Sequence, residues 1–382
     1  MSTRCFALFF SVVFIPVFAL FSACVPESRS RTELALGTLC RIELFGGGTP
    51  ELHNRLFSRL YEIERIMSAN LADSEVSRIN RAAGLVPVPV SRELFIVLER
   101  ALYFAEASDG AFDPTIGPLV TLWGIGGDNP QVPGREAIDA ARALVNWKEL
   151  ELKRETGQGA GQTAETAAGT AFLRRPGMAL DLGAIAKGFA ADELVKILRE
   201  AGTKGAVIDL GGNIYVYGTK PRIGPFFSRS GGTAKWRVGI QNPLDDRGAY
   251  AGYVEVDESS VVTSGVYERF FVEDGKRYHH ILDTRTGFPV ENGLLAVTIT
   301  SPSSMDADAL STAVFALGRE KGGVLVETHA AGGTGVGAGS PVGAVFIFAD
   351  NTIRTISVDF TLTDGRWVNT APLVSFPVVK QP

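Results

Sequence analysis

The chain has 382 residues, of which 45% are hydrophobic and 21% are charged. This composition is typical of a globular protein with one large domain or two small ones. The formal net charge is −5 at pH 7. A weakly acidic chain lacks the basic surface that nucleic acid requires, so we exclude nucleic acid as a partner.

The first 23 residues are predicted to be an export signal. Arg4 and the amino terminus supply positive charge, and residues 6–21 are apolar except for Ser11. This apolar run is short for a membrane-spanning helix and ends in small residues, as cleaved signals do.

Residues 21–24, Phe-Ser-Ala-Cys, resemble a bacterial lipobox in which Phe replaces the usual Leu. Cys24 would then carry lipid, residues 24–31 would form a polar tether, and residues 32–382 would form the folded domain. We therefore expect an exported protein, lipid-anchored to the inner membrane and facing the periplasm. A plain signal peptide or an uncleaved anchor is the alternative.

Cysteine usage agrees with export. Cys5 would leave with the signal and Cys24 would be lipidated, which leaves Cys40 alone in the mature domain. No disulfide within the mature chain is then possible, and we expect Cys40 to be a packed, unreactive thiol.

The first half of the chain is predicted to be mainly helical. A strand is expected over residues 36–44, and apolar residues spaced by three and four predict helices over 51–67, 92–108 and 135–145. Residues 155–170 are rich in Gly, Ala, Thr and Gln without an apolar period, so we expect a flexible insertion there.

The second half mixes both element types. Helices are predicted over 184–201 and 306–317, and a Gly-rich loop over 330–340. Strands are predicted over 178–182, 205–210, 214–217, 235–240, 250–256, 261–262, 269–272, 294–300, 342–349, 353–358 and near 366. Strands and helices do not alternate strictly, so the expected class is α+β, with mixed or antiparallel sheets packed against helices.

Residues 181–188, Asp-Leu-Gly-Ala-Ile-Ala-Lys-Gly, combine small residues with a predicted helix start. Free N–H groups at a helix start attract anions, and Lys187 adds a positive charge. The segment is not a P-loop, because the Gly-Lys-Ser/Thr order is absent. A purely structural turn is the alternative.

Residues 278–287 contain the adjacent histidines His279 and His280 before an Asp-Thr-Arg-Thr-Gly turn. Neighbouring strand residues point to opposite faces, so the pair does not suit one metal ion, but one histidine could act as a base. A half-exposed histidine beside a turn is the other interpretation.

Residues 306–312 place Asp308 and Thr312 one helical turn apart on one face. Their oxygen atoms suit Mg²⁺ better than zinc. The simpler alternative is that Asp306 or Asp308 caps the helix. Residues 110–115 with Trp123 could likewise stack on a heterocycle or simply pack in the core.

Taken together and in order, these segments resemble the FAD:protein FMN transferase (ApbE-like) family. The resemblance covers nearly the whole mature chain and runs through residues 36–38, 67–68, 73–80, 110–118 with Trp123, 180–188 with Asp192, 210–213, 263–269, 280–283 and 308–312. It implies an ApbE-like, T-fold-related architecture for residues 32–382.

The resemblance also implies site roles. Asp308 and Thr312 would bind Mg²⁺ through their side chains, and a backbone carbonyl of residues 184–186, first of all that of Ala186, would complete the set. His280 would activate a Thr or Ser hydroxyl of an acceptor protein, with AMP released from FAD. FAD would be held by Leu36, Asn70, Ala111, Phe112, Asp113, Asp181, Lys187 and Leu282.

Three positions depart from the family pattern. Asn70 stands where Tyr is frequent, Leu36 replaces Met, and Thr284 replaces Pro. Asn cannot stack on a flavin, so we also expect hydrolysis of FAD to FMN and AMP, with water as the acceptor. The main alternative is a non-catalytic FAD-binding or storage lipoprotein. A redox flavoenzyme is less favoured, because the dinucleotide Gly-x-Gly-x-x-Gly pattern is absent.

Overall fold

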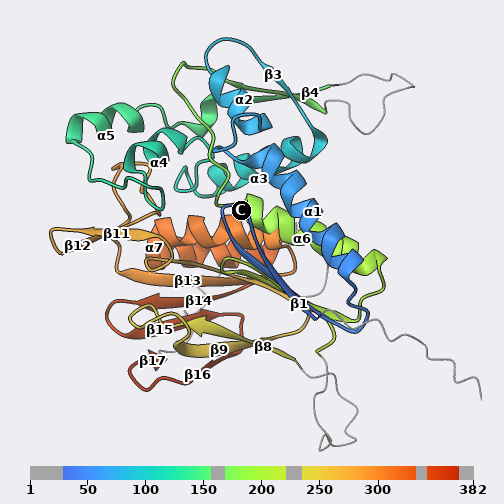
Figure 1. Ribbon diagram of the computed structural model, residues 1–382. Coiled ribbons are helices and arrows are strands. Elements are labelled where there is room, and N and C mark those ends of the chain that lie inside the picture. Colours follow the sequence, from blue (N-terminus) through green and yellow to red (C-terminus); the bar gives the residue numbers. More distant parts are fainter. Residues whose placement is uncertain (1–28, 156–167, 221–234, 333–341, 370–382) are drawn as a thin grey trace, which may run out of the picture.

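The computed structural model describes residues 29–155, 168–220, 235–332 and 342–369, which form stacked layers of sheet and helix (Figure 1). The central layer is a nine-stranded sheet in the order β1-β2-β6-β7-β10-β13-β14-β15-β17. Neighbouring strands are antiparallel except for the last pair, β15 and β17. The bounds are β1 Ser30–Ala35, β2 Thr38–Phe45, β6 Gly205–Leu210, β7 Asn213–Gly218, β10 Ser259–Gly265, β13 Leu294–Ser301, β14 Gly343–Phe348, β15 Thr352–Ile356 and β17 Val368–Asn369.

The two faces of this sheet build two cores. On β14, Phe346 and Phe348 pack toward the helices, whereas Val345 and Ile347 pack toward the opposite layer, because successive strand residues point to opposite faces. The helical layer contains α1 (Pro50–Met67), α6 (Ala186–Glu200) and α7 (Ser304–Gly332), and the opposite layer is the sheet β16-β9-β8, with bounds Phe360–Leu362, Tyr250–Val256 and Trp236–Gln241.

A second group of elements lies beyond the helical layer (Figure 1). It contains α2 (Glu75–Arg81), α3 (Arg92–Ala107), α4 (Gly117–Trp123), α5 (Arg135–Arg142), the 3-10 turn η1 (Trp147–Glu149) and the sheet β3-β5-β4, with bounds Val88–Val90, Gly169–Leu173 and Leu150–Arg154. The hairpin of β11 (Phe270–Glu273) and β12 (Lys276–His279) projects from the edge of the molecule near α4 and α5.

Helix α7 is broken at Gly318, whose φ of 79° lies in the left-handed region. Ahead of the break, the Asn292 side-chain amide donates to the Phe315 carbonyl at 2.7 Å, which satisfies a carbonyl that the break would leave without a helical partner. The helix therefore has two segments, and the first of them carries Asp308 and Thr312.

Helices α6 and α7 approach each other closely at Gly188. A Cβ atom at this position would lie 2.2 Å from the Ser304 carbonyl oxygen and 2.6 Å from the Met305 Cα. Only glycine permits this spacing, so the residue fixes the distance between the two helices that carry the candidate site.

The α+β class is confirmed, with antiparallel sheets packed against helices. The helices expected over 51–67, 92–108, 184–201 and 306–317 are confirmed, with shifted ends. The expected helix over 135–145 ends at Arg142. The short helices α2 and α4, each of seven residues, were not predicted because two turns carry too little periodicity.

Several expected boundaries were wrong. The strand expected over 36–44 begins only at Thr38, because Leu36 (φ 52°) and Gly37 (φ 67°) form a tight turn. Strand β1 precedes this turn and includes residues 30 and 31, which the sequence assigned to the tether. Residues 178–182 form no strand, and Ala179 makes only an isolated bridge with Ile116.

The expected insertion over 155–170 extends too far, because β5 begins at Gly169; residues 156–167 lie outside the described residues. The loop expected over 330–340 overlaps the end of α7, and residues 333–341 are likewise not described. The export signal and Cys24 also fall outside the described residues. In the described part of the chain, no helix has the length and apolarity needed to cross a membrane.

Candidate active site

The turn before α6 is fixed by its own hydrogen bonds. The Asp181 carboxylate accepts from the Gly183 N–H at 2.8 Å, and the Leu182 carbonyl accepts from the N–H groups of Ile185 and Ala186 at 3.1 and 2.9 Å. Asp181 thus closes an Asx-type turn that leads directly into the helix. This arrangement holds the Gly183 carbonyl beside the side chain of Lys187.

Asp308 faces this turn from the first segment of α7. Its side chain is buried, and Oδ2 accepts from the Gly188 N–H at 3.0 Å. The Lys187 Nζ atom lies 3.4 Å from both carboxylate oxygens and donates to the Gly183 carbonyl at 2.5 Å. The sequence-predicted residues Asp181, Lys187 and Asp308 are therefore brought together at the junction of two helices.

Thr312 lies within a cluster of hydroxyl groups beside Asp308. The Ser264 hydroxyl lies 2.9 Å from that of Ser311 and 3.4 Å from that of Thr312. The Ser311 hydroxyl in turn donates to the Asp308 backbone carbonyl at 2.9 Å. This network links β10 to α7 and orients the face on which both predicted metal ligands stand.

These oxygen atoms fit a magnesium ion. The Asp308 Oδ1 atom has only the long contact to Lys187 among the described hydrogen bonds, so it retains acceptor capacity. No group of three or more His, Cys, Asp or Glu side chains gathers as a metal site in the described residues. One carboxylate with neutral oxygens suits Mg²⁺, which commonly completes its shell with water and substrate phosphate.

The two adjacent histidines have different environments. His279 is buried: its Nε2 lies 3.0 Å from the Val290 carbonyl, and its Nδ1 accepts from the Ile281 N–H at 3.3 Å. Both ring nitrogens are engaged within the protein. His279 therefore helps to hold the loop that follows β12 and has no nitrogen available for a substrate.

His280, the first residue after β12, is half-buried. Its Nδ1 lies 3.2 Å from the Arg269 carbonyl, which requires the proton on Nδ1 and leaves Nε2 as an acceptor. Burial lowers the pKa of His280 to about 3, and the charges of Arg269 and Lys187 act in the same direction. The imidazole is thus neutral at neutral pH, as a general base must be.

The Asp113 side chain is hydrogen-bonded within the protein. Its carboxylate accepts from the Thr115 N–H and hydroxyl at 2.8 and 2.7 Å, and from the Trp147 N–H at 2.9 Å. Burial raises the pKa of Asp113, and these donors oppose the rise. The side chain therefore shapes the loop that presents Ala111 and Phe112; its expected contact with FAD stays a prediction.

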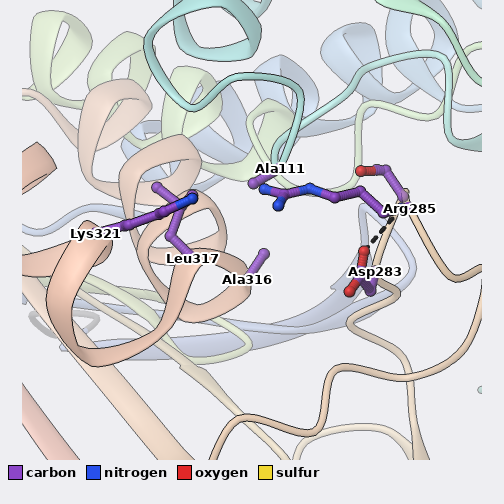
Figure 2. A pocket seen from close by; sticks show the side chains of 7 residues that line it. Ala111, Asp283, Arg285, Ala316, Leu317 and Lys321 are labelled. Carbon is purple, nitrogen blue, oxygen red and sulfur yellow. Dashed lines mark hydrogen bonds between the residues drawn. The ribbon is translucent and has the colours of Figure 1, made fainter.

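Ala111 borders a pocket of about 170 Å³. Figure 2 shows Arg285 and Lys321 reaching toward this space from opposite sides, with a hydrogen bond from the Arg285 N–H to Asp283. The other lining residues are Thr284, Ala316 and Leu317, the last two at the break in α7. Arg285 belongs to the Asp-Thr-Arg-Thr-Gly turn within residues 278–287, but neither Arg285 nor Lys321 was among the predicted site residues.

The remaining predicted FAD contacts lie around these groups. Leu36 stands at the tip of the β1–β2 hairpin, where the Arg269 guanidinium donates to the Gly37 carbonyl at 3.1 Å. Arg269 therefore joins this tip to His280. Asn70 is exposed, whereas Leu282 packs in a small core with Trp123 and turns its side chain away from solvent.

Phe112 is buried and packs edge-on against Phe104, with ring centroids 6.3 Å apart. Cys40 is buried as well, and burial raises the pKa of its thiol to about 12. The expectation that Cys40 is packed in the core is confirmed, and its lack of reactivity stays a prediction.

Asp192 has a positioning role that its sequence block did not reveal. Its carboxylate accepts from the N–H groups of Ser304 and Met305 at 2.8 and 3.0 Å, which caps the first turn of α7. Because Asp308 stands one turn later, this cap from α6 sets the position of the predicted metal ligand.

Comparison with known proteins identifies the family. Residues 36–334 match the model of the ApbE family, so the chain belongs to the ApbE family. A relative from Treponema pallidum, named FAD:protein FMN transferase, is 42% identical and covers 85% of this chain and 86% of its own length. A protein of the same name from Klebsiella pneumoniae is 40% identical over 71% of this chain and 77% of its own length.

Solved structures agree. The ApbE protein from Thermotoga maritima superimposes with a TM-score of 0.69 at 29% identity, covering 88% of this chain and 96% of that one. The flavin transferase ApbE from Vibrio cholerae gives a TM-score of 0.66 at 28% identity, with 87% and 96% covered. The family resemblance and the fold expected from sequence are therefore confirmed.

Proposed function

We propose that this protein is an FAD:protein FMN transferase that cleaves the FAD pyrophosphate with Mg²⁺, attaches FMN to a Thr or Ser hydroxyl of an acceptor protein, and releases AMP. The named activity of its relatives supports the reaction class. The observation that carries the proposal is the neutral His280, with Nε2 available, near a buried carboxylate–lysine cluster.

In the proposed reaction, His280 accepts the proton of the acceptor hydroxyl on Nε2. The hydroxyl oxygen forms a bond to the FMN phosphorus, the bond from that phosphorus to the bridging oxygen breaks, and AMP leaves with the bridging oxygen. The Arg269 carbonyl holds the imidazole in the tautomer that this step needs. Bound Mg²⁺ would be held by Asp308, Thr312 and a carbonyl of the preceding turn, and would neutralise charge on the pyrophosphate.

Hydrolysis of FAD to FMN and AMP is proposed as a second activity. Asn70 is exposed and offers an amide where many family members offer a ring. Water can replace the acceptor hydroxyl without any change in the residues that contact metal and pyrophosphate. AMP and free FMN formed without an acceptor protein would support this activity, and strict dependence of AMP on an acceptor would exclude it.

Replacement of Asp308 by Ala separates an enzyme from an FAD-storage lipoprotein. In the enzyme, the variant keeps measurable FAD binding but loses Mg²⁺-dependent AMP formation. A storage protein needs no metal ligand, so its FAD affinity would be unchanged and neither form would release AMP. Flavin fluorescence titration and chromatographic detection of AMP measure the two quantities.

The location of the protein is also proposed. A signal over residues 1–23 and lipid on Cys24 would place the enzyme on the outer side of the inner membrane, where it would meet exported acceptor proteins. Mass spectrometry of the amino-terminal peptide from the cell membrane tests this: a lipid-modified Cys24 supports the anchor, and an unmodified amino terminus at Met1 contradicts it.

A further inference from the structure

The ammonium group of Lys187 lies among the oxygen atoms that would bind a divalent metal. The inference drawn from this position rests on the proposed function. The Nζ atom lies 2.5 Å from the Gly183 carbonyl oxygen and 3.4 Å from each carboxylate oxygen of Asp308. Asp308 is buried and Lys187 is mostly buried, so their charges are only partly screened by water.

A metal ion bound to the Asp308 carboxylate and the Lys187 ammonium group in its present position would compete for the same oxygens. Mg²⁺ binds carboxylate oxygen at about 2.0–2.1 Å, which would place it close to an ammonium group that lies 3.4 Å from both oxygens of the same carboxylate. Asp308 supplies one negative charge for the two cations. The Asp181 carboxylate is already directed at the Gly183 N–H, and no third acid joins a metal-type cluster in the described residues.

Lysine is suited to an exchange of position. The lysine ammonium group is compact and is carried by a flexible four-carbon side chain. Lys187 is the second residue of α6, and its side chain is partly exposed beside the preceding turn. Asp308 by contrast is fixed by the Gly188 N–H and by the capped start of α7. The cation can therefore move while the carboxylate stays.

We propose that Lys187 is an exchangeable cation: its ammonium neutralises Asp308 until a divalent metal binds, and metal binding releases it toward the pyrophosphate of FAD. The lysine competes with the metal when FAD is absent and assists FAD when the metal is present. Metal and FAD therefore bind with positive coupling, and the coupling is reciprocal because it is a single free energy.

Direct metal binding without FAD tests the competition. Mn²⁺, followed by electron paramagnetic resonance, is titrated into the full chain in detergent as wild type, Lys187→Met and Lys187→Arg. Lys196→Met is the matched control, because Lys196 lies on the same helix but pairs with Glu193 at the surface. Circular dichroism confirms that each variant is folded.

We expect Lys187→Met to bind Mn²⁺ about tenfold more tightly than wild type, a shift of about 1.4 kcal/mol. Lys187→Arg, which keeps the charge, and Lys196→Met should stay within about twofold of wild type. An unchanged or weaker Mn²⁺ affinity in Lys187→Met would overturn the inference. It would also be overturned if neither wild type nor Lys187→Met bound Mn²⁺ at millimolar concentration.

The coupling gives a second test. Flavin fluorescence measures FAD affinity with and without Mg²⁺, and the tightening produced by Mg²⁺ should be smaller in Lys187→Met than in wild type; an equal or larger tightening would contradict the exchange. The Mn²⁺ titration contains no FAD, so its result does not depend on turnover. If no AMP forms, the proposed function is wrong. If the Mn²⁺ affinity of Lys187→Met equals that of wild type, only the proposed exchange of Lys187 is wrong.

Discussion

At the scale of single residues, the adjacent histidines His279 and His280 have different roles. Both ring nitrogens of His279 are hydrogen-bonded, to the Val290 carbonyl and the Ile281 N–H. In His280 only Nδ1 is hydrogen-bonded, to the Arg269 carbonyl. His280 follows directly after the end of β12, and the positive charges of Arg269 and Lys187 help to keep its imidazole neutral.

Replacement of His280 by Gln should reduce covalent FMN transfer by about 100-fold or more, since a positioned general base contributes about 10²–10⁴. FAD affinity should change little, because the ring is assigned to the acceptor hydroxyl. Single-turnover AMP release and fluorescence titration measure the two effects. Equal losses in binding and in transfer would show that His280 holds FAD and does not act as the base.

The lowered pKa of His280 also predicts a pH dependence of stability. The folded value, about 3, lies below the unfolded value of about 6.5, so protonation favours the unfolded chain. The stabilisation is complete above pH 6.5 and is lost as pH falls toward 3. Between pH 7 and pH 5, wild type should lose about 1–2 kcal/mol more unfolding free energy than His280→Gln.

Urea unfolding at the two pH values measures this difference, and His279 titrates alike in both proteins. Equal losses in wild type and variant would show that His280 is not held neutral by the fold.

At the scale of elements, the contact between α6 and α7 builds the site. Gly188 lets the helices meet, its N–H holds Asp308, and Asp192 on α6 caps α7. The same pair of helices thus packs the core and positions the proposed metal ligands, so changes in packing should also change metal affinity.

Replacement of Gly188 by Ala should cost about 1–3 kcal/mol of unfolding free energy, because the added methyl group would overlap the Ser304 backbone. Mn²⁺ affinity should fall as well, since Asp308 moves with α7. Gly134→Ala is the matched control: its φ is −63° and no atom lies within 4 Å of an added Cβ. Similar losses in both variants would contradict the close-packing account.

Replacement of Asp192 by Ala should cost about 2 kcal/mol, which is at the upper end for a lost helix cap, because the carboxylate is buried and satisfies two backbone N–H groups. Chemical denaturation measures the loss. A change below about 0.5 kcal/mol would show that water replaces the cap and that α7 does not depend on it.

At the scale of the whole molecule, the sequence predicted the long elements well. Helix α1 has apolar residues at every third or fourth position, so its period was visible in the sequence, and the structure adds a Thr49 cap that accepts from the Leu52 N–H. The all-buried strand β14 was equally clear, because every residue faces one of two cores.

The sequence could not show what depends on contacts between distant segments. Nothing local indicates that Arg269 would bridge the hairpin tip to His280, or that Arg285 and Lys321 would meet across a pocket. The helix predicted over 306–317 ends where α7 breaks at Gly318, but the second segment of α7 beyond the break was not predicted. The order of the motifs in the sequence predicted the site residues, whereas the contacts among them are visible only in the folded structure.

The most direct test of the account is AMP release from FAD by the full chain in detergent, measured with Mg²⁺ and with EDTA. A membrane-protein fraction serves as acceptor, and denaturing gels reveal bound flavin by fluorescence. We predict AMP with Mg²⁺, none with EDTA, and a fluorescent protein band that survives denaturation. Tight FAD binding with no AMP under either condition would contradict the transferase assignment.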